Sequence, residues 1–282
     1  MKTINEAYPE ILRKVLHKGK PTFPRGFVCK ELDGFQVVLD MNEPVLTLGH
    51  RNCNQGFMVA EFLWILAGRK DVRFIEMFNK RMATFSDDGN TLYGAYGQNM
   101  LKQMSFCLKT LREDNDSRQA VMTFWKPSPK KSKDVPCTIG LHFMVRDGKL
   151  NCYSHMRSND LWLGFPYDFY TFSMLSKFVA DNIGVKLGYL VHNADSMHLY
   201  DEHLLKVKSM LEEPRCFIKN EAKTEKSFEL GNKCEDAFEE FQLLLNEELE
   251  AIVEELNIHV EGFPEGIKTL VLNIDNYIME KK

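Results

Sequence analysis

The sequence predicts a single α+β domain, because helical and paired strand patterns follow one another without a linker or an internal repeat. Residues 54–68 form a nearly all-apolar run closed by a glycine, which predicts a core helix. Residues 138–145 and 149–155 alternate between apolar and polar side chains on either side of Arg146-Asp147-Gly148. That pattern predicts a β-hairpin with an Asp-Gly turn. We therefore expect one domain over all 282 residues.

The remaining segments alternate between strand-like and helical patterns. Strands are predicted at 120–125 and 189–195, and helices at 169–182 and 198–211. A charged amphipathic helix at 235–256 begins a C-terminal helical tail from about residue 235, and its apolar stripe contains Phe238, Phe241, Leu244, Leu245 and Leu249.

Composition narrows the class of protein. The 36 basic and 40 acidic residues give a net charge of −4, so no global basic field favours duplex nucleic acid. No apolar run approaches the length of a membrane span, and the N-terminal Met-Lys-Thr-Ile lacks the apolar stretch of a signal peptide, which predicts a cytoplasmic location. The seven cysteines are odd in number and include no C-x-x-C pair, so neither a disulfide framework nor a metal site is indicated. A local basic cluster is interpreted as a solvated loop and contains Lys126, Lys130, Lys131 and Lys133.

Three residues have both a chemical and an ordinary structural interpretation. Glu61 lies inside the apolar helix pattern at 54–68. A buried glutamate with a raised pKa handles protons, but Glu61 fits a polar seam between helices equally well. Cys137 follows Pro136 where a loop meets a strand, a position more often taken by a small core residue than by a nucleophile. Asp168, taken alone, is a typical helix N-cap.

Six short motifs occur in order within roughly residues 20–205: Glu61-Phe62-Leu63-Trp64, Tyr93-Gly94-Ala95-Tyr96-Gly97, Asp116-Ser117-Arg118, Pro136-Cys137-Thr138, the stretch from Arg157 to Asp168, and His198-Leu199-Tyr200. Together they resemble motifs of the thymidylate synthase family, and six in the same order make a chance match improbable. The resemblance implies a thymidylate synthase-like three-layer α+β fold, whose large mixed sheet packs sheet-on-sheet in a homodimer.

The resemblance also implies roles for individual residues. Cys137 is implied to add to C6 of a pyrimidine nucleoside monophosphate, which makes C5 nucleophilic. Arg157 is expected to lower the pKa of Cys137 and to hold the phosphate in a bidentate fork. The activated C5 captures a one-carbon unit from 5,10-methylenetetrahydrofolate, with Glu61 and Tyr96 moving protons. The full implied sets are Cys137, Glu61, Asp168, Tyr96 and Asp160 for catalysis; Arg25, Arg118, Arg157, Ser158, Asn159, His198 and Tyr200 for the nucleotide; and Glu61, Phe78, Asp160 and Gly164 for the folate.

The expectation about which base the protein binds rests on Asp168. The family ends this stretch with an asparagine whose amide pairs with uracil, whereas this chain has an aspartate. A carboxyl group accepts from the N4 amino group of cytosine and, when protonated, donates to N3. A mismatched base leaves a buried polar group unpaired, at about 1–3 kcal/mol. The substitution therefore predicts a cytidylate substrate.

Three departures from the family pattern bear on phosphate binding and on the product. Arg118-Gln119 replaces two adjacent arginines, so Arg25 or a lysine is expected to compensate at the phosphate. The segments 156–160 and 195–198 are nearer to the cytidylate hydroxymethyltransferase branch. The C-terminal segment 276–282 lacks the apolar end that closes the folate site in the synthases. Because that closure excludes water, we expect water addition and a hydroxymethyl product, with methylation of dUMP, UMP or dCMP as the alternative.

Two other classes of function remain open, and the resemblance also implies a homodimer. The chain could be a non-catalytic nucleotide- or RNA-binding module, or a cysteine hydrolase that uses His142 or His155 as the base. In the homodimer that the resemblance implies, Arg118 serves the neighbouring subunit's phosphate site. The interface is then expected to bury a set of aromatic residues, unless these fill the monomer's own core: Phe124, Trp125 and Phe143.

Overall fold

The structure, a computed structural model, describes residues 1–48, 51–66 and 68–212. The helix expected at 235–256, the tail that it begins, and the segment 276–282 lie outside these residues. Among the helices of the described part, none is both long and apolar enough to cross a membrane.

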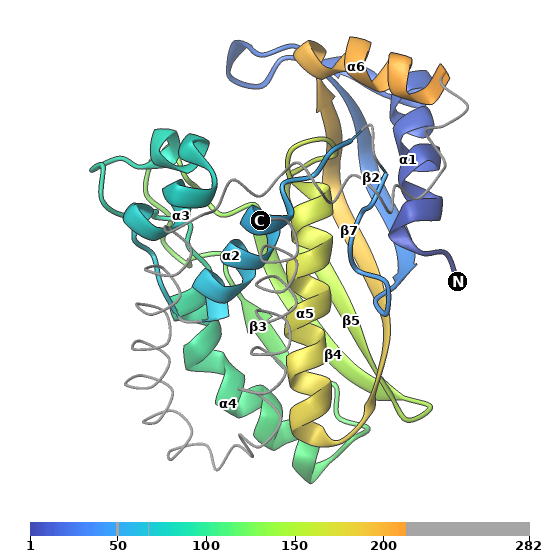
Figure 1. Ribbon diagram of the computed structural model, residues 1–282. Helices are drawn as coiled ribbons and strands as arrows, with labels where there is room; N and C mark the ends of the chain where they lie inside the picture. Colours follow the sequence, from blue (N-terminus) through green and yellow to red (C-terminus); the bar gives the residue numbers. More distant parts are fainter. Residues whose placement is uncertain (49–50, 67, 213–282) are drawn as a thin grey trace, which may run out of the picture.

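Figure 1 shows the helices and strands of the described chain in sequence order by colour. The helices are α1 (Ile4–Lys18), α2 (Gln55–Leu66), α3 (Val72–Phe78), α4 (Gly97–Glu113), α5 (Phe165–Ile183) and α6 (Asp201–Glu212), with short 3-10 helices at Pro24–Gly26 and Lys80–Phe85. The strands are β1 (Lys20–Thr22), β2 (Cys29–Asp40), β3 (Val121–Thr123), β4 (Thr138–Arg146), β5 (Lys149–Met156), β6 (Asn159–Asp160) and β7 (Lys186–Tyr200).

The strands form one mixed sheet in the order β1-β2-β7-β5-β4-β3, with β6 also paired to β7. Neighbours are antiparallel except that β7 runs parallel to β5 and to β6. The long pairing of β2 with β7 brings Cys29 opposite Tyr200 and Asp40 opposite Tyr189. The expected α+β class with a large mixed sheet is therefore confirmed.

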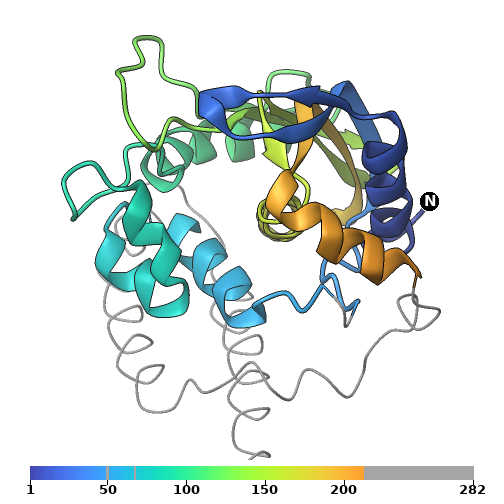
Figure 2. The same ribbon diagram turned by 90° about the horizontal axis from the view of Figure 1, so that it is seen from above.

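Helix α5 packs against β5 and β7 on one face of this sheet; Figure 1 shows it in front of the strands, and Figure 2 shows it nearly end-on. It begins after Gly164 with Pro166 in its first turn and ends at Gly184, whose φ of 73° is left-handed and favours glycine. The helix expected at 169–182 thus begins earlier than predicted. Asp168 consequently lies inside the first turn, and the N-cap interpretation of this residue is wrong.

The predicted hairpin and core helix are confirmed, whereas the strand expected at 189–195 extends over Lys186–Tyr200. Asp147 and Gly148 have φ values of 52° and 69°, as a tight turn between β4 and β5 requires. The helix expected from residue 198 begins only at 201, because 198–200 pair with β2 as the end of β7. Local periodicity contains no information about that distant pairing.

The two faces of the sheet differ in burial. Phe124 and Phe143 are fully buried in the chain's own core and Trp125 is partly buried, so the core interpretation holds for the two phenylalanines. The face without α5 presents exposed or half-exposed apolar side chains instead: Val38, Val121, Met144, Tyr153, Tyr189 and Val191.

Candidate active site

Four of the expected catalytic residues come together from separate elements. Asp168 lies in the first turn of α5, Glu61 in α2, Tyr96 just before α4, and Cys137 just before β4. The charge of Asp168 raises the pKa of each of the other three groups, which places them within electrostatic reach of it. The site therefore forms where α5, α2 and the start of β4 meet.

The two carboxyl groups of this cluster titrate near neutral pH. Burial, followed by the charge of Asp168, raises the pKa of Glu61 to about 8. Burial also raises the pKa of Asp168 to about 7, with a further increase from Asp160, while a hydrogen bond from Asn159 acts in the opposite direction. Glu61 is thus mostly neutral at pH 7, and Asp168 is close to half protonated. Because α2 packs against α5, Glu61 also lies at a polar contact between helices, so its position fits both interpretations.

A buried polar chain leads away from Asp168. The Asn159 Nδ2 donates to Asp168 Oδ2 at 2.7 Å, and His192 Nε2 lies 2.9 Å from Asn159 Oδ1. On its other side His192 Nδ1 lies 2.8 Å from the Ser154 hydroxyl. His192 and Ser154 were not among the expected site residues. The sequence contained one signal that could have identified them: both are polar residues at positions where a strand pattern points the side chain into the core.

Asp160 and Gly164 shape the turn that leads into α5. Asp160 Oδ1 accepts from the backbone N–H groups of Trp162 and Leu163, at 2.8 and 2.9 Å. A Cβ atom on Gly164 would lie 3.1 Å from Asp168 Oδ2 and 3.2 Å from Asn159 Nδ2. The absence of a side chain at Gly164 therefore makes room for the Asn159–Asp168 hydrogen bond.

Arg157 braces the loop that carries Cys137. Its Nε donates to the Pro136 carbonyl and its Nη2 to the Val135 carbonyl, both at 2.8 Å, and Nη2 lies 3.8 Å from the Cys137 Sγ. The Nε and Nη2 donors that a bidentate fork to phosphate would use are thus engaged with backbone oxygens. Arg157 holds the loop of Cys137 in place and puts a positive charge beside the sulfur.

Arg157 lowers the pKa of the Cys137 thiol as expected, but the net pKa of this thiol is raised. Burial is the largest cause, and it outweighs the opposing effect of the Arg157 guanidinium. The negative charges of Asp168 and Asp134 also raise this pKa, while Arg25 lowers it. Neutralising Asp168 removes one of the charges that favour the thiol, so a proton on Asp168 favours the Cys137 thiolate.

Two contacts attach the segment from Tyr93 to Tyr96 to the loop around Cys137. The Tyr96 hydroxyl accepts from the backbone N–H and the hydroxyl of Thr138, at 3.3 and 3.0 Å. The Gly94 N–H donates to Asp134 Oδ2 at 2.7 Å, and a Cβ atom on Gly94 would lie 2.6 Å from the Asp134 carbonyl oxygen. Tyr96 is therefore fixed next to Cys137 from a separate segment.

The expected sugar residues lie at the end of β7. His198 pairs with Asp160 across β6, and its carbonyl accepts from the Leu161 N–H at 2.8 Å. The rings of His198 and Tyr200 are 5.1 Å apart, and Phe27 packs edge-on against Tyr200. Phe27 continues the loop of Arg25, whose φ of 54° is strained for a residue with a side chain. Arg25 is exposed, and its positive charge lowers the pKa of Cys137.

Three other expected residues take different places. Arg118 is exposed and its backbone bonds to His142, which lies five residues along β4 from Cys137, or roughly 16 Å. Phe78 is half-buried at the end of α3, with its ring against Phe74 and its carbonyl accepting from Asn54. Ser158 is half-buried between Arg157 and β6. Arg118 is thus separated from the cluster within one chain.

The two histidines considered as hydrolase bases lie elsewhere. His155 is exposed and pairs with Asp195 at 2.8 Å, while His142 is five residues along β4 from the sulfur. Neither forms a hydrogen bond to Cys137 in the described part of the chain, whose Sγ contact comes from Arg157. A cysteine–histidine pair is therefore not assembled.

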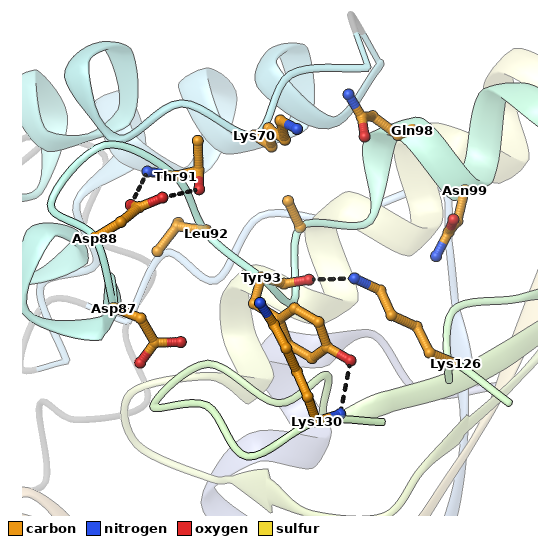
Figure 3. Close-up of a pocket in the computed structure, with 11 residues that line it drawn as sticks. Lys70, Asp87, Asp88, Thr91, Leu92, Tyr93, Gln98, Asn99, Lys126 and Lys130 are labelled. Atoms are coloured by element: carbon orange, nitrogen blue, oxygen red, sulfur yellow. Dashed lines mark hydrogen bonds between the residues drawn. The ribbon is translucent and has the colours of Figure 1, made fainter. Parts of the chain in front are cut away.

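The basic loop is held more firmly than its composition indicates, beside a cavity of about 330 Å³. Figure 3 shows that the Lys126 Nζ donates to the Tyr93 carbonyl and the Lys130 backbone N–H to the Tyr93 hydroxyl. Lys133 is tied to the same region through Asp87 and Ser86. Lys130, Lys131 and Lys133 are exposed, as the solvated-loop interpretation expects, whereas Lys126 is partly buried. Within the described residues, no cluster of three or more potential ligands is arranged to hold a metal ion.

Comparison with known proteins gives two findings. The family model described as thymidylate synthase matches residues 6–248. A deoxyuridylate hydroxymethyltransferase of Bacillus phage SP01 is 35% identical over 218 residues, which cover 69% of this chain and 56% of that protein. One of Pseudomonas phage M6 is 33% identical over 219 residues, which cover 73% and 62%. The chain thus spans about three fifths of the length of these relatives.

Proposed function

This chain belongs to the thymidylate synthase family, and we propose that it transfers a one-carbon group to C5 of a cytidine nucleoside monophosphate. The proposed co-substrate is 5,10-methylenetetrahydrofolate and the proposed product carries a hydroxymethyl group. The observation that carries the choice of base is Asp168, a carboxyl group whose pKa of about 7 keeps a proton available in the site.

The proton on Asp168 supports recognition of cytosine. A neutral carboxyl group offers one donor and one acceptor side by side, which match cytosine N3 and the N4 amino group. Cytosine N3 is basic enough to share that proton, so the pair stays bound whether the proton is on oxygen or on nitrogen. Because N3 is conjugated with C6, a proton there also favours attack at C6.

Uridylate is the second candidate, and the names of the two phage relatives favour it. A neutral carboxyl group can also donate to uracil O4 and accept from N3–H. Uracil O4 is not basic, however, so ionised Asp168 repels it and no shared proton compensates. The cytosine complex therefore keeps its hydrogen bonds when Asp168 is only partly protonated, whereas the uracil complex loses one.

Cys137 is the proposed covalent catalyst. Its thiolate adds to C6, the C5–C6 double bond opens, and the electron pair moves toward N3, where Asp168 holds a proton. C5 then becomes a nucleophile toward a one-carbon electrophile, and loss of the C5 proton and of the sulfur restores the ring. The structure supports this through Arg157, which places a positive charge 3.8 Å from the sulfur.

The residues near Glu61 fit a folate. When bound, 5,10-methylenetetrahydrofolate supplies a one-carbon unit at the oxidation level of formaldehyde. Phe78 offers a half-buried ring, and Asp160 Oδ2 receives no hydrogen bond from the described residues, which leaves it for a donor on the pterin. Glu61, mostly neutral at pH 7, would first give its proton to the folate nitrogen as the bond from that nitrogen to the transferred carbon breaks, and its carboxylate would then take a proton from an ordered water that attacks this carbon. The water oxygen then becomes the hydroxyl of the product.

The proposed partner is a second copy of the chain. The sheet face without α5 is free of helices in the described part and presents Val38, Val121 and Tyr153, of which the two valines are 42% and 41% exposed. Such a face is buried when two sheets pack together. Arg118 lies at the β3–β4 side of this sheet, away from its own Cys137, which suits a residue that serves the partner's phosphate.

Product analysis tests the proposed function. The protein is incubated with 5,10-methylenetetrahydrofolate and each of CMP, dCMP, UMP and dUMP, and the masses of the products are measured by mass spectrometry. We expect a gain of one CH₂O unit on the cytidylates and at most slow turnover of the uridylates. Methylated products would overturn the hydroxymethyl assignment, and no product from any nucleotide would overturn the transferase assignment.

Subunit mixing tests the shared site. We expect Arg118→Ala and Cys137→Ser homodimers to be inactive or weak, and their mixture to recover up to about a quarter of wild-type activity, because random exchange makes half the dimers mixed and each has one intact site. Subunit exchange is verified with differently tagged chains. A mixture of Arg118→Ala with Glu61→Gln should recover similarly. No recovery after verified exchange would place Arg118 outside the partner's site.

A further inference from the structure

Three buried polar side chains and the partly buried Asp168 form one hydrogen-bonded chain that reaches from the centre of the sheet to the start of α5. Ser154 of β5 and His192 of β7 are register partners in the parallel pairing, Asn159 belongs to β6, and Asp168 to α5. Ser154, His192 and Asn159 are 0%, 0% and 2% exposed. Each link is 2.7 to 2.9 Å long. Because each of the four side chains comes from a different element, they meet only in the folded protein.

The chemistry of His192 gives the chain a direction. Burial lowers the pKa of His192 to about 3, so the ring is neutral and has one donor and one acceptor nitrogen. Asn159 Oδ1 can only accept, so His192 Nε2 donates to it, and Nδ1 then accepts from the Ser154 hydroxyl. The amide nitrogen of Asn159 is thereby turned toward Asp168.

That orientation distinguishes the two oxygens of Asp168. Oδ2 accepts the Asn159 N–H at 2.7 Å, and a carbonyl oxygen accepts better than a protonated hydroxyl oxygen. The proton of the neutral acid is therefore favoured on Oδ1. A turned amide would present Oδ1 of Asn159 instead, draw the proton to Asp168 Oδ2, and remove the donor from the other oxygen.

We propose that His192 is a positioning residue for base recognition: supported by Ser154, it fixes the Asn159 amide and so directs the proton of Asp168 to Oδ1, where the pyrimidine is read. This inference rests on the proposed function, because it assigns the device that sets the donor side of the base-reading carboxyl. His192 itself packs against the rings of Phe165 and Phe172 and is separated from the base by two residues, Asn159 and Asp168.

Apolar packing alone would not call for this arrangement. A buried polar chain gives little net stability over apolar side chains of similar size, whereas it fixes one orientation when every member is satisfied. The other ionisable groups around Asp168 are Glu61, Asp160, Cys137 and Tyr96, and none of them forms a hydrogen bond to its carboxylate in the described part. Asn159 is the donor through which the chain acts on it.

The test measures the affinity for CMP and dCMP as a function of pH, by calorimetry. In the wild type the affinity falls as pH rises through about 7, as Asp168 ionises. In His192→Leu the Asn159 amide can turn, and Asp168 loses a hydrogen bond that lowers its pKa. We expect the midpoint to move up by about one pH unit and the affinity below pH 7 to fall about tenfold. His192→Gln, which can again donate to Asn159, should restore both values toward wild type.

A smaller change guards against misfolding of the leucine variant. Ser154→Ala removes only the donor to His192 Nδ1 and should shift the midpoint in the same direction by a smaller amount. Ser176→Ala is the matched control, because this serine is equally buried but its hydroxyl donates to the Phe172 carbonyl. An unchanged midpoint and affinity in folded His192→Leu would overturn the inference while leaving the proposed function intact. Absence of cytidylate binding by the wild type would instead overturn the proposed function.

Discussion

Cys137→Ser abolishes hydrogen release from C5 of the nucleotide, by on the order of 10⁴-fold or more, while nucleotide binding survives. The reason is that a hydroxyl at this position is far less acidic than a thiol, and Arg157 cannot make it an effective nucleophile. The measurement is tritium release from 5-tritiated CMP or dCMP, together with calorimetry of the same nucleotide. Retained binding is expected because the sulfur forms its bond only after the nucleotide is in place.

Cys29→Ser is the matched control for this substitution. Cys29 is also buried, and its sulfur already shares a hydrogen bond with the Thr22 hydroxyl at 3.0 Å, which a serine can keep. Cys29→Ser should therefore retain tritium release. Undiminished release from Cys137→Ser would place the nucleophile elsewhere and restore the non-covalent alternatives.

Asp168→Asn shifts the preference from cytidylates toward uridylates, by roughly 10- to 100-fold in the ratio of their kcat/KM values. An amide has a fixed donor and a fixed acceptor, and the loss or gain of one well-paired buried hydrogen bond corresponds to about 1–3 kcal/mol. The asparagine also has no proton to lose. The decline in nucleotide affinity as pH rises through about 7 should therefore disappear in this variant.

Asp181→Asn serves as the control on the same helix. Asp181 is exposed in the last turn of α5 and pairs with Lys177, so its neutralisation should leave both the base preference and the pH profile unchanged. Equal turnover of dUMP and dCMP by the unmodified protein would refute the assignment of cytosine to Asp168.

The predictions that succeeded depended on local pattern. The hairpin around Asp147-Gly148 and the core helix with Glu61 each follow from the spacing of apolar residues and from turn chemistry, which act over a few neighbouring positions. The boundary at residue 201 was misplaced because the strand pairing of 198–200 involves residues more than 160 positions away. The expected aromatic interface was likewise corrected by burial, since Phe124 and Phe143 lie in the chain's own core.

The sequence by itself determined which chemical groups this protein has: a thiol after a proline, a carboxyl in an apolar helix, and an aspartate at the end of the Arg157–Asp168 stretch. Only the tertiary structure decided how these groups behave. Burial makes Asp168 titrate near 7 and outweighs Arg157 at Cys137, and the sheet brings His192 and Ser154 into line with Asn159. The physical reason is that a residue's identity fixes what it can donate or accept, whereas its proton affinity and orientation depend on neighbours that are distant in sequence.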